Sequence, residues 1–438
     1  MAGTIAYHMM SYYNANTSSS DLHVGELPEP YFWWQAGALW GVALDYFYYT
    51  GDASYNDALT AALTDPSNTG SDFDYVPEEH SVGMANDDIF HWAAAALSAA
   101  ERNFPQPEDD VPSWLEMSRN AFDRLTDEWS DKTCSGGLPW VRRNGPSYKN
   151  TATNGGLFQL AARLSRATDD DGGKYVEWAE KAWDWTADVG FLTKDYDIYD
   201  GAHGDNDCKD VNKLQWSYIN GIYLYGAAVM ANYTGEEKWI ERAEGLLSAT
   251  EIFFSEKNDD VDADDDAEEA EEGILWEVAC ERIETCTVDM MAFKGILARY
   301  MWQSTHMIPS MRDTVRSRLT PSAEMAALTC TGGDLGECGF AWYTGENDGK
   351  LGLGSEMSAL ETIQGLLIGE MNPPLSAKEI KRVGSDGSSG QGSGDKDEDG
   401  DGAEQEAENE DSAGGALAVS WQGAILASGV SCLAMLFA

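Results

Sequence analysis

Apolar residues recur at three- and four-residue intervals along most of the first 370 positions of the chain. This spacing is the signature of helices that bury one face or are buried on all sides. It predicts about a dozen helical segments, at 4–14, 31–50, 54–64, 87–103, 112–130, 151–167, 173–189, 213–233, 236–250, 288–303, 309–328 and 355–369. No stretch alternates apolar and polar residues clearly enough to predict a strand. The pattern therefore predicts an all-α protein.

Two of the joints between these segments have nearly the same sequence. Residues 49–52 read Tyr-Thr-Gly-Asp and residues 233–236 read Tyr-Thr-Gly-Glu. Glycine ends one helix in a left-handed conformation, and the acid opens the next. The repeat indicates helical hairpins, which bury their faces by stacking on one another. Six hairpins closed into a ring fit the number of segments, with loops at one end of the ring forming a cleft.

The charge of the chain is strongly acidic but unevenly distributed. The net charge is −48 over 438 residues, and the segments 256–272 and 386–411 each hold eleven acids and one lysine. We expect 256–272 to be an inserted acidic loop. Because the remainder is also acidic, nucleic acid and anionic membrane surfaces are poor partners, whereas a neutral glycan is compatible. The 16 Trp and 19 Tyr residues either pack in the core or line a carbohydrate groove.

The cysteines indicate an oxidising compartment. Cys432 lies in the apolar tail, and an even six lie in the globular part: Cys134, Cys208, Cys280, Cys286, Cys330 and Cys338. Close spacing favours Cys280–Cys286 and Cys330–Cys338, which leaves Cys134–Cys208, although all fifteen pairings are open. None has the spacing of a zinc site, so we expect no metal and no other cofactor. Asn16 and Asn232 begin glycosylation tripeptides, which also fits secretion.

The C-terminal region follows the pattern of a glycosylphosphatidylinositol (GPI) attachment signal. A catalytic or binding domain would occupy 1–383, followed by an acidic Gly/Ser stalk at 384–415 that cannot fold alone. Small residues beginning at Ser412 precede an uncharged segment, 416–438. We therefore expect lipid anchoring near Ser412 at the plasma membrane or cell wall, with a transmembrane anchor as the alternative. The chain begins without a signal peptide, so we expect that its true start lies upstream.

Asn86-Asp87-Asp88 is the strongest candidate for chemistry. The pair lies at a predicted helix start, where flexible aspartates can hold their carboxyl groups about 5 to 6 Å apart, near the separation of retaining glycosidases. Repulsion between such close charges raises one pKa, which leaves one acid protonated beside one ionised nucleophile. The alternative is a capping role, because Asn is a preferred N-cap and acids favour a first helical turn.

Several segments together resemble one enzyme family. They are 31–37 (YFWWQAG), Asn86-Asp87-Asp88, 154–163 (NGGLFQLAAR), 199–201 (YDG) and 215–221 (QWSYING). In this order, from about Thr4 to Glu370, they resemble glycoside hydrolase family 76, and in particular its fungal cell-wall mannan endo-1,6-alpha-mannosidases. The resemblance implies an (α/α)6 barrel and retaining cleavage or transfer of α-1,6-linked mannose.

The resemblance also implies roles for individual residues. Asp87 falls at the nucleophile, Asp88 at the acid/base, and Asp200 at a residue that binds a sugar hydroxyl. The other expected substrate-binding residues are Trp33, Trp34, Asn86, Trp140, Asn154, Trp216, Tyr218 and Asn220. The implied donor is α-mannan or a GPI-core glycan, the implied acceptor is water or wall β-glucan, and we expect a monomer.

The chain departs from the family pattern at two places. Ile89 stands where Gln usually follows the acidic pair, and residues 287–290 read Thr-Val-Asp-Met where Asn-Thr-Asp-Gln is usual. Losing two amides alters hydrogen bonding in a subsite. Two other functions are kept as alternatives: an inverting enzyme on the same barrel, and a catalytically inert mannan-binding wall protein.

Overall fold

The computed structural model describes residues 1–14, 22–81, 84–108, 110–141, 148–170, 173–255 and 272–380. All twelve predicted helical segments form helices there, with a short extra helix, α4, between two of them. The bounds are α1 Ala2–Asn14, α2 Trp33–Thr50, α3 Asn56–Thr64, α4 Pro66–Thr69, α5 Asn86–Glu101, α6 Trp114–Asp127, α7 Thr151–Thr168, α8 Lys174–Asp188, α9 Ser217–Thr234, α10 Glu237–Ala249, α11 Phe293–Met307, α12 Arg312–Thr329 and α13 Leu353–Gln364.

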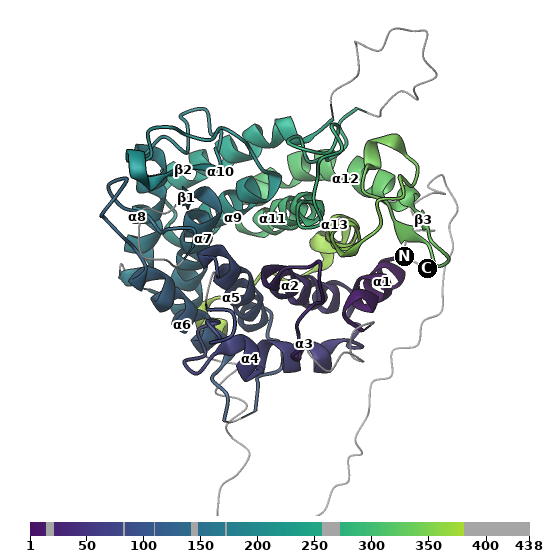
Figure 1. The fold of residues 1–438 in the computed structure, drawn as a ribbon, viewed down its shortest axis with the longest axis horizontal. Coiled ribbons are helices and arrows are strands. Elements are labelled where there is room, and N and C mark those ends of the chain that lie inside the picture. Colours follow the sequence, from purple (N-terminus) through teal and green to yellow (C-terminus); the bar gives the residue numbers. More distant parts are fainter. Residues whose placement is uncertain are drawn as a thin grey trace, which may run out of the picture.

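The helices form two concentric rings (Figure 1). In the inner ring, α2 packs on α5, α5 on α7, α7 on α9, α9 on α11, and α11 on α13, which returns to α2. Each of α3, α6, α8, α10 and α12 packs outside the inner helix that precedes it in the chain. The sixth outer helix is α1, which covers α13, so the two ends of the chain complete the ring together. The predicted (α/α)6 barrel is confirmed.

Inner and outer helices differ in how their apolar residues are distributed around the helix axis. The inner helix α5 buries every residue from Ile89 to Glu101, whereas the outer helix α6 buries only one face, including Met117, Phe122 and Leu125. Close approach within the inner ring depends on small residues. At Gly37 of α2, an added Cβ would come within 2.6 Å of the Trp92 ring on α5.

The predicted glycine joints are present. Gly51 and Gly235 have φ angles of 73° and 69° and donate to carbonyls of the last turns of α2 and α9. The acid has its predicted place only at the second joint, where Glu236 is the N-cap of α10. At the first joint Asp52 caps a turn instead, by accepting from the Ser54 amide at 3.0 Å.

Short strands are present that the sequence did not indicate. Antiparallel β1 (Tyr148–Asn150) and β2 (Gly201–His203) pair Lys149 with Ala202, and β3 (Cys330–Gly332) pairs with β4 (Glu337–Cys338). Two or three residues are too few to show an alternating pattern. The all-α fold class holds with these two minor sheets added, and the β1–β2 pair carries part of the site described below.

Three disulfides join the pairs favoured by spacing: Cys134–Cys208, Cys280–Cys286 and Cys330–Cys338. Asn232 lies exposed in the last turn of α9, where its amide oxygen accepts from Arg166 at 3.0 Å and its nitrogen donates to the Met307 carbonyl at 3.2 Å. Asn16, the acidic segment up to residue 271, the stalk, Ser412 and the apolar tail lie outside the described residues. Within the described residues, no helix has the length and apolar character needed to cross a bilayer.

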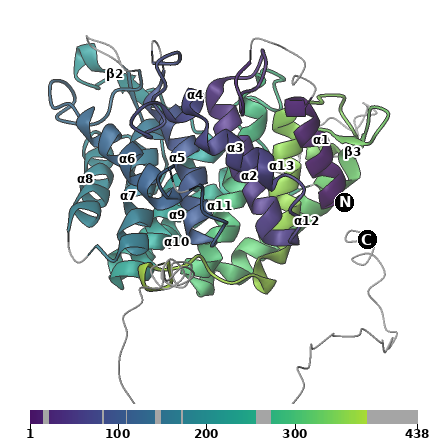
Figure 2. The ribbon, with the colours of Figure 1, turned by 90° about the horizontal axis from the view of Figure 1, so that it is seen from below.

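Residues 371–380, which we call the C-terminal strap, run across one end of the barrel (Figure 2). The Leu375 amide donates to the carbonyl of Glu101, the last residue of α5, at 2.6 Å. Arg166, near the end of α7, donates to the carbonyls of Pro374 and Leu375 at 2.9 and 3.0 Å. The strap therefore lies at the C-terminal ends of inner helices.

Candidate active site

A cleft of about 910 Å³ opens at the other end of the barrel, where inner helices begin. A volume of this size is typical of ligand sites. The cleft is lined by Phe32, Trp33, Trp34, Glu79, His80, Met84, Ala85, Asp87, Asp88, His91, Trp140, Val141, Tyr148, Asn150, Asp200, Trp216, Tyr218, Asp289, Met290 and Phe293. The first residues of α2, α5, α9 and α11 all contribute, so the ring gathers residues that are more than 200 positions apart.

Asp87 and Asp88 lie in the first turn of α5, at the base of this cleft. The N-cap is Ala85 rather than Asn86, and Asp88 accepts from the Ala85 amide at 3.0 Å. Asp88 therefore has the capping role of the alternative interpretation and also faces the cleft. Asp87 Oδ1 is buried and has no hydrogen-bond partner within the described residues. A buried carboxylate oxygen that is left unpaired inside a cleft is available to a ligand.

The environment favours protonation of both carboxyl groups. Burial, with the charges of Asp88 and Asp200, raises the pKa of Asp87 well above its usual range, against a hydrogen bond from the Trp140 side chain. Burial raises the pKa of Asp88 to about 6, while the Ala85 amide and the charge of His80 hold it down. Two such close groups titrate as a pair. Acid–base chemistry at such a pair requires one protonated and one ionised carboxyl group, and a raised pKa favours the protonated form.

Asp200 forms the opposite wall and is held by three donors. Its side chain accepts from the Tyr148 hydroxyl, from Trp216 Nε1 at 3.1 Å and from Asn212 Nδ2 at 3.1 Å. The antiparallel pairing of β1 with β2 sets this arrangement, because it brings Tyr148 beside the segment that contains Asp200. Asp200 is therefore a positioned carboxylate that faces Asp87.

Aromatic rings make up much of the remaining surface. Trp33 stacks on His80, with ring centroids 5.3 Å apart, and on Trp92 at 5.0 Å. The ring centroid of Phe293 lies 4.2 Å from that of Tyr218 and 5.6 Å from that of Trp216. The Trp140 side chain is 43% exposed at the rim. Flat rings around a polar base form the kind of surface on which the C–H faces of sugars stack.

Eight of the eleven predicted site residues line the cleft, and three asparagines do not. Asn86 is fully buried and donates to the Pro139 carbonyl at 2.9 Å. Asn154, also fully buried, accepts from the Leu138 amide at 2.8 Å and donates to the Leu138 carbonyl at 3.1 Å. Both amides therefore fasten the segment that carries Trp140. Asn220 is 2% exposed within α9.

Several lining residues were missed by the sequence analysis. Tyr148 and Asn150 belong to the unpredicted strand β1, and Phe293 had been counted as an ordinary helix residue. His80 comes six residues before the Asn-Asp-Asp motif, and its Nε2 lies 2.6 Å from a carboxylate oxygen of Glu26. A histidine in the loop before the acidic pair was the one signal available for it.

Among the described residues, no group of three or more His, Cys, Asp and Glu side chains has an arrangement that could hold a metal ion. The carboxylates that line the cleft are Glu79, Asp87, Asp88, Asp200 and Asp289. Carboxylates of this kind attack, protonate or deprotonate a bound substrate directly.

Comparison with known proteins agrees with the geometry. The model for glycosyl hydrolase family 76 matches residues 1–378. The mannan endo-1,6-alpha-mannosidase DCW1 of Candida glabrata is 38% identical over 393 residues, which cover 88% of this chain and 83% of that protein. The mannan endo-1,6-alpha-mannosidase DFG5 of Saccharomyces cerevisiae is 36% identical over 84% of this chain and 77% of its own length.

Solved structures share the fold. The crystal structure of Dfg5 from Chaetomium thermophilum, in complex with glucosamine, superposes with a TM-score of 0.78 at 35% identity and covers 86% of this chain and 92% of that one. The GH76A alpha-1,6-mannanase of Salegentibacter sp. HEL1_6 superposes with a TM-score of 0.63 at 21% identity, covering 84% of this chain and 98% of that one. The chain therefore belongs to glycosyl hydrolase family 76.

Proposed function

We propose that this protein is a retaining glycosidase or transglycosidase that acts on α-1,6-linked mannose. The observation that carries the proposal is the pair Asp87 and Asp88, which are adjacent in the first turn of α5 and both line an aromatic cleft that raises the pKa of each. Its relatives DCW1 and DFG5 are named as mannan endo-1,6-alpha-mannosidases. These relatives support α-1,6-mannan as the substrate class.

In the proposed mechanism, Asp87 attacks the anomeric carbon while Asp88 protonates the departing oxygen, and a covalent mannosyl-enzyme forms. Asp88 then removes a proton from the acceptor, which displaces Asp87. In the free site burial raises the pKa of both aspartates, so the complex must favour ionisation of Asp87. Positive charge that develops at the anomeric carbon favours ionised Asp87, because that carboxylate lies against it.

Asp200 is proposed to accept a hydrogen bond from a hydroxyl of the attacked sugar. Its three donors already fix its position, so little ordering remains to be done when the sugar binds. Trp33, Trp34, Trp140, Trp216 and Tyr218 are proposed to stack on neighbouring mannose units. This division separates residues that bind the glycan from the pair that breaks its bond.

The test is turnover of α-1,6-mannotetraose by Asp87→Asn and Asp88→Asn. We expect both variants to bind the tetrasaccharide and neither to cleave it. Asp57→Asn is the matched control, because Asp57 also lies in a first helical turn but outside the cleft. Binding of the tetrasaccharide without cleavage by the parent itself would leave a mannan-binding protein whose acidic pair only caps a helix, and unchanged cleavage by Asp87→Asn would remove Asp87 from the mechanism.

The stereochemistry of the product separates the proposal from an inverting enzyme. Proton NMR of the first product should show the α-anomer before mutarotation, because two displacements restore the configuration. A β-anomer at the earliest time points would mean that water attacks directly, and the double displacement would be abandoned.

Transfer to wall β-glucan is the more specific part of the proposal. Aromatic surfaces that hold an acceptor and exclude water favour transfer over hydrolysis. Dfg5 of Chaetomium thermophilum was solved with glucosamine, so a donor that contains an amino sugar, such as a GPI-core glycan, is tested beside α-mannan. Mass spectrometry of reactions with and without a β-1,3-glucan oligosaccharide should reveal a mixed product. Release of mannose products alone would restrict the enzyme to hydrolysis.

We further propose secretion and lipid anchoring near Ser412, with the stalk 384–415 between anchor and domain. The composition of 384–438 supports this proposal. The test is expression behind a secretory leader in a fungal cell, followed by phosphatidylinositol-specific phospholipase C. Release from membranes is expected, and retention after treatment would favour a transmembrane anchor.

A further inference from the structure

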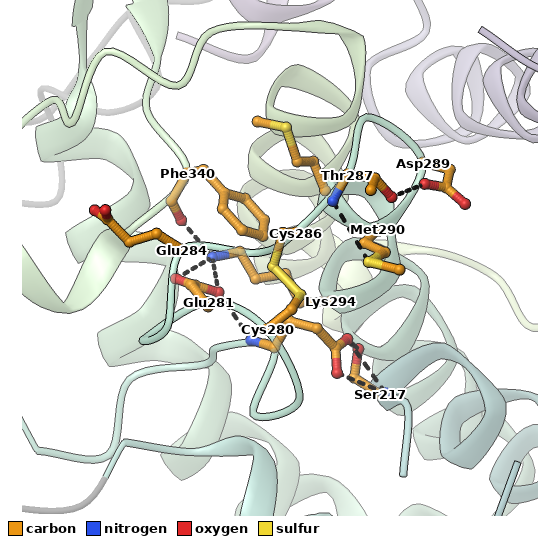
Figure 3. The surroundings of a disulfide bond; sticks show 12 residues. Ser217, Cys280, Glu281, Glu284, Cys286, Thr287, Asp289, Met290, Lys294 and Phe340 are labelled. Atoms are coloured by element: carbon orange, nitrogen blue, oxygen red, sulfur yellow. Dashed lines mark hydrogen bonds and ion pairs between the residues drawn. A yellow bond between two sulfur atoms is a disulfide. The ribbon is translucent and has the colours of Figure 1, made fainter. Parts of the chain in front are cut away.

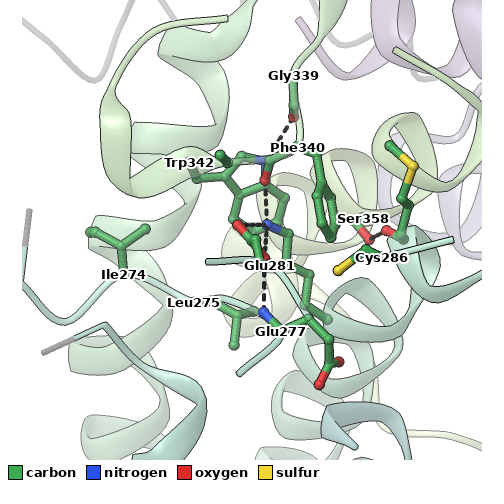
Figure 4. Close-up of polar contacts among 12 residues, drawn as sticks. Ile274, Leu275, Glu277, Glu281, Cys286, Gly339, Phe340, Trp342 and Ser358 are labelled. Atoms are coloured by element: carbon green, nitrogen blue, oxygen red, sulfur yellow. Dashed lines mark hydrogen bonds and ion pairs between the residues drawn. The ribbon is translucent and has the colours of Figure 1, made fainter. Parts of the chain in front are cut away.

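A set of buried charged residues behind the cleft wall has no part in the proposed chemistry. Glu277, Glu281 and Lys294 are 0%, 1% and 0% exposed, and Lys294 forms an ion pair with Glu281 at 3.1 Å. Lys294 also donates to the Phe340 carbonyl and lies 4.1 Å from the Trp342 ring centroid. Figure 4 shows Glu281 between Glu277 and the Phe340 carbonyl. Burying three ionisable groups is costly, so their arrangement calls for a function.

This set reaches the cleft through Ser217. The Glu277 carboxylate accepts from the Ser217 hydroxyl and, at 3.3 and 3.4 Å, from the Ser217 amide. Ser217 is the first residue of α9, which has no cap of its own because its N-cap is Trp216. Glu277 therefore caps α9 from a distant part of the chain.

Ser217 stands between two residues of the cleft wall, Trp216 and Tyr218. Its own side chain is fully buried and points away from the cleft toward Glu277. Trp216 in turn donates to Asp200 at 3.1 Å. The contact with Glu277 therefore fixes the backbone that orients the rings of Trp216 and Tyr218. Through Trp216 it also positions one of the hydrogen-bond donors to Asp200.

The other end of the set reaches the same wall through α11. Lys294 directly follows Phe293, whose ring contacts both Trp216 and Tyr218. Glu281 connects the two ends, because its carboxylate accepts from Lys294 and from the Glu277 amide at 2.8 Å. The Cys280–Cys286 disulfide closes the loop that holds Glu281, and this loop continues to Asp289 and Met290 of the cleft (Figure 3).

We propose that the chain of contacts Lys294–Glu281–Glu277–Ser217, which we call the buried relay, is a positioning element that sets the aromatic wall of the mannan cleft. The inference deepens the proposed function and depends on it. Glu277 is its central residue, a positioning residue that touches no sugar. A neutral side chain that accepts a hydrogen bond from the Ser217 amide would cap α9 equally well. The position of the Glu277 acceptor oxygen therefore matters, rather than its charge.

The test compares Glu277→Leu with Glu277→Gln. Leu keeps the volume and removes the acceptor, whereas Gln keeps an acceptor oxygen. For α-1,6-mannan oligosaccharides we expect Glu277→Leu to raise KM about tenfold with kcat changed by less than about twofold, because a binding surface shared by ground and transition states is lost. Glu277→Gln should stay within about twofold of the parent in KM.

Glu356→Ala is the matched control. Glu356 is another buried glutamate that accepts from a backbone amide, that of Cys338 at 2.7 Å, but it does not line the cleft. The Glu356→Ala substitution should lower the melting temperature and leave KM unchanged. If Glu277→Leu behaves in this way, or if Glu277→Gln raises KM as much as Glu277→Leu, the positioning role is overturned.

Ser217→Ala keeps the proposal testable if Glu277→Leu does not fold. It removes only the hydroxyl contact and should raise KM about threefold, whereas an unchanged KM would overturn the proposal. Calorimetry with α-1,6-mannotetraose in the Asp87→Asn background separates the two hypotheses. No binding by the parent would reject the proposed function, whereas equal binding by parent and relay variants would reject only the relay.

Discussion

Two effects disfavour the ionised form of Asp87: its carboxyl group is buried, and the carboxylate of Asp88 lies beside it. Its raised pKa means that the unfolded chain ionises this group at lower pH than the folded protein does. Below the usual aspartate pKa the group is protonated in both states and has no effect. As pH rises, ionisation favours the unfolded chain, and folding stability falls until the raised pKa is passed. The proposed catalytic residue Asp87 therefore lowers stability at neutral pH, as active-site residues commonly do.

We predict that Asp87→Asn melts about 2 to 4 °C higher than the parent at pH 7. The gain should vanish near pH 4, where Asp87 is protonated in the parent. Differential scanning fluorimetry at both pH values measures it, with Asp57→Asn as the exposed control. A variant that melts lower at pH 7 would show that the Asp87 carboxylate stabilises the fold.

His80 is predicted to set the alkaline limit of activity. Its positive charge lowers the pKa of Asp88, the proposed proton donor. Replacing it with glutamine raises that pKa, so Asp88 stays protonated to higher pH. The alkaline limb of kcat/KM against pH should therefore move upward in His80→Gln. His306→Gln, a substitution beside Tyr48 far along α2 from the cleft, should leave the profile in place. A downward shift in His80→Gln would contradict the electrostatic role.

At this scale, sequence located the residues that carry a recognisable pattern. Asp87, Asp88, Asp200 and the tryptophans were found because they lie in motifs, and the cleft does contain them. Asn154 lies in an equally strong motif, yet its side chain forms hydrogen bonds with the main chain of Leu138 and does not line the cleft. A motif identifies residues under constraint and leaves open whether the constraint is a ligand or a main-chain segment.

At the scale of elements, helices were predictable and short strands were not. Periodicity needs several turns or several alternations, which α5 offers and β1 does not. Helix starts were also placed a few residues early where the chain approaches the cleft. Residues 213–216 were expected in α9, but Trp216 has extended backbone angles and the helix begins at Ser217. The capping group, Glu277, is 60 residues away and invisible to a local pattern.

The Cys134–Cys208 disulfide closes 74 residues, whereas Cys280–Cys286 closes six. Loop-closure entropy gives a stabilisation of about 4 kcal/mol for the first and about 2 kcal/mol for the second. We predict that Cys134→Ser/Cys208→Ser loses about twice as much free energy of unfolding as Cys280→Ser/Cys286→Ser in urea titrations. Cys330→Ser/Cys338→Ser, which opens a loop of similar length to the second, should match it. The reverse order would mean that local packing, rather than loop length, sets the stabilisation.

At the scale of the molecule, the ring was predictable from the number and repetition of hairpins. The helix pair that completes the ring was not, because the helix that covers α13 is α1, from a distant part of the chain. The C-terminal strap was also missed. It has no periodicity and is held by contacts to the ends of helices, chiefly through Arg166.

We predict that Arg166→Ala releases the strap. Two charge-assisted hydrogen bonds to the carbonyls of Pro374 and Leu375 are lost, each worth about 1.5 to 3 kcal/mol. Limited proteolysis followed by mass spectrometry should show faster cleavage within 371–380 than in the parent. Arg316→Ala, at an exposed position of α12, is the control and should be cut at the parental rate. The Tyr48 hydroxyl also holds the strap, by donating to the Asn372 carbonyl. Equal rates for Arg166→Ala would show that this contact and the Leu375 amide suffice.

The strap gives the barrel a direction. Helix α5 carries Asp87 at one end and receives Leu375 at the other, and its 16 residues span about 24 Å between them. If the protein is anchored through the residues that follow the strap, the cleft lies at the end of the barrel opposite the anchor. A long polysaccharide then reaches the cleft from either side without meeting the anchoring segment.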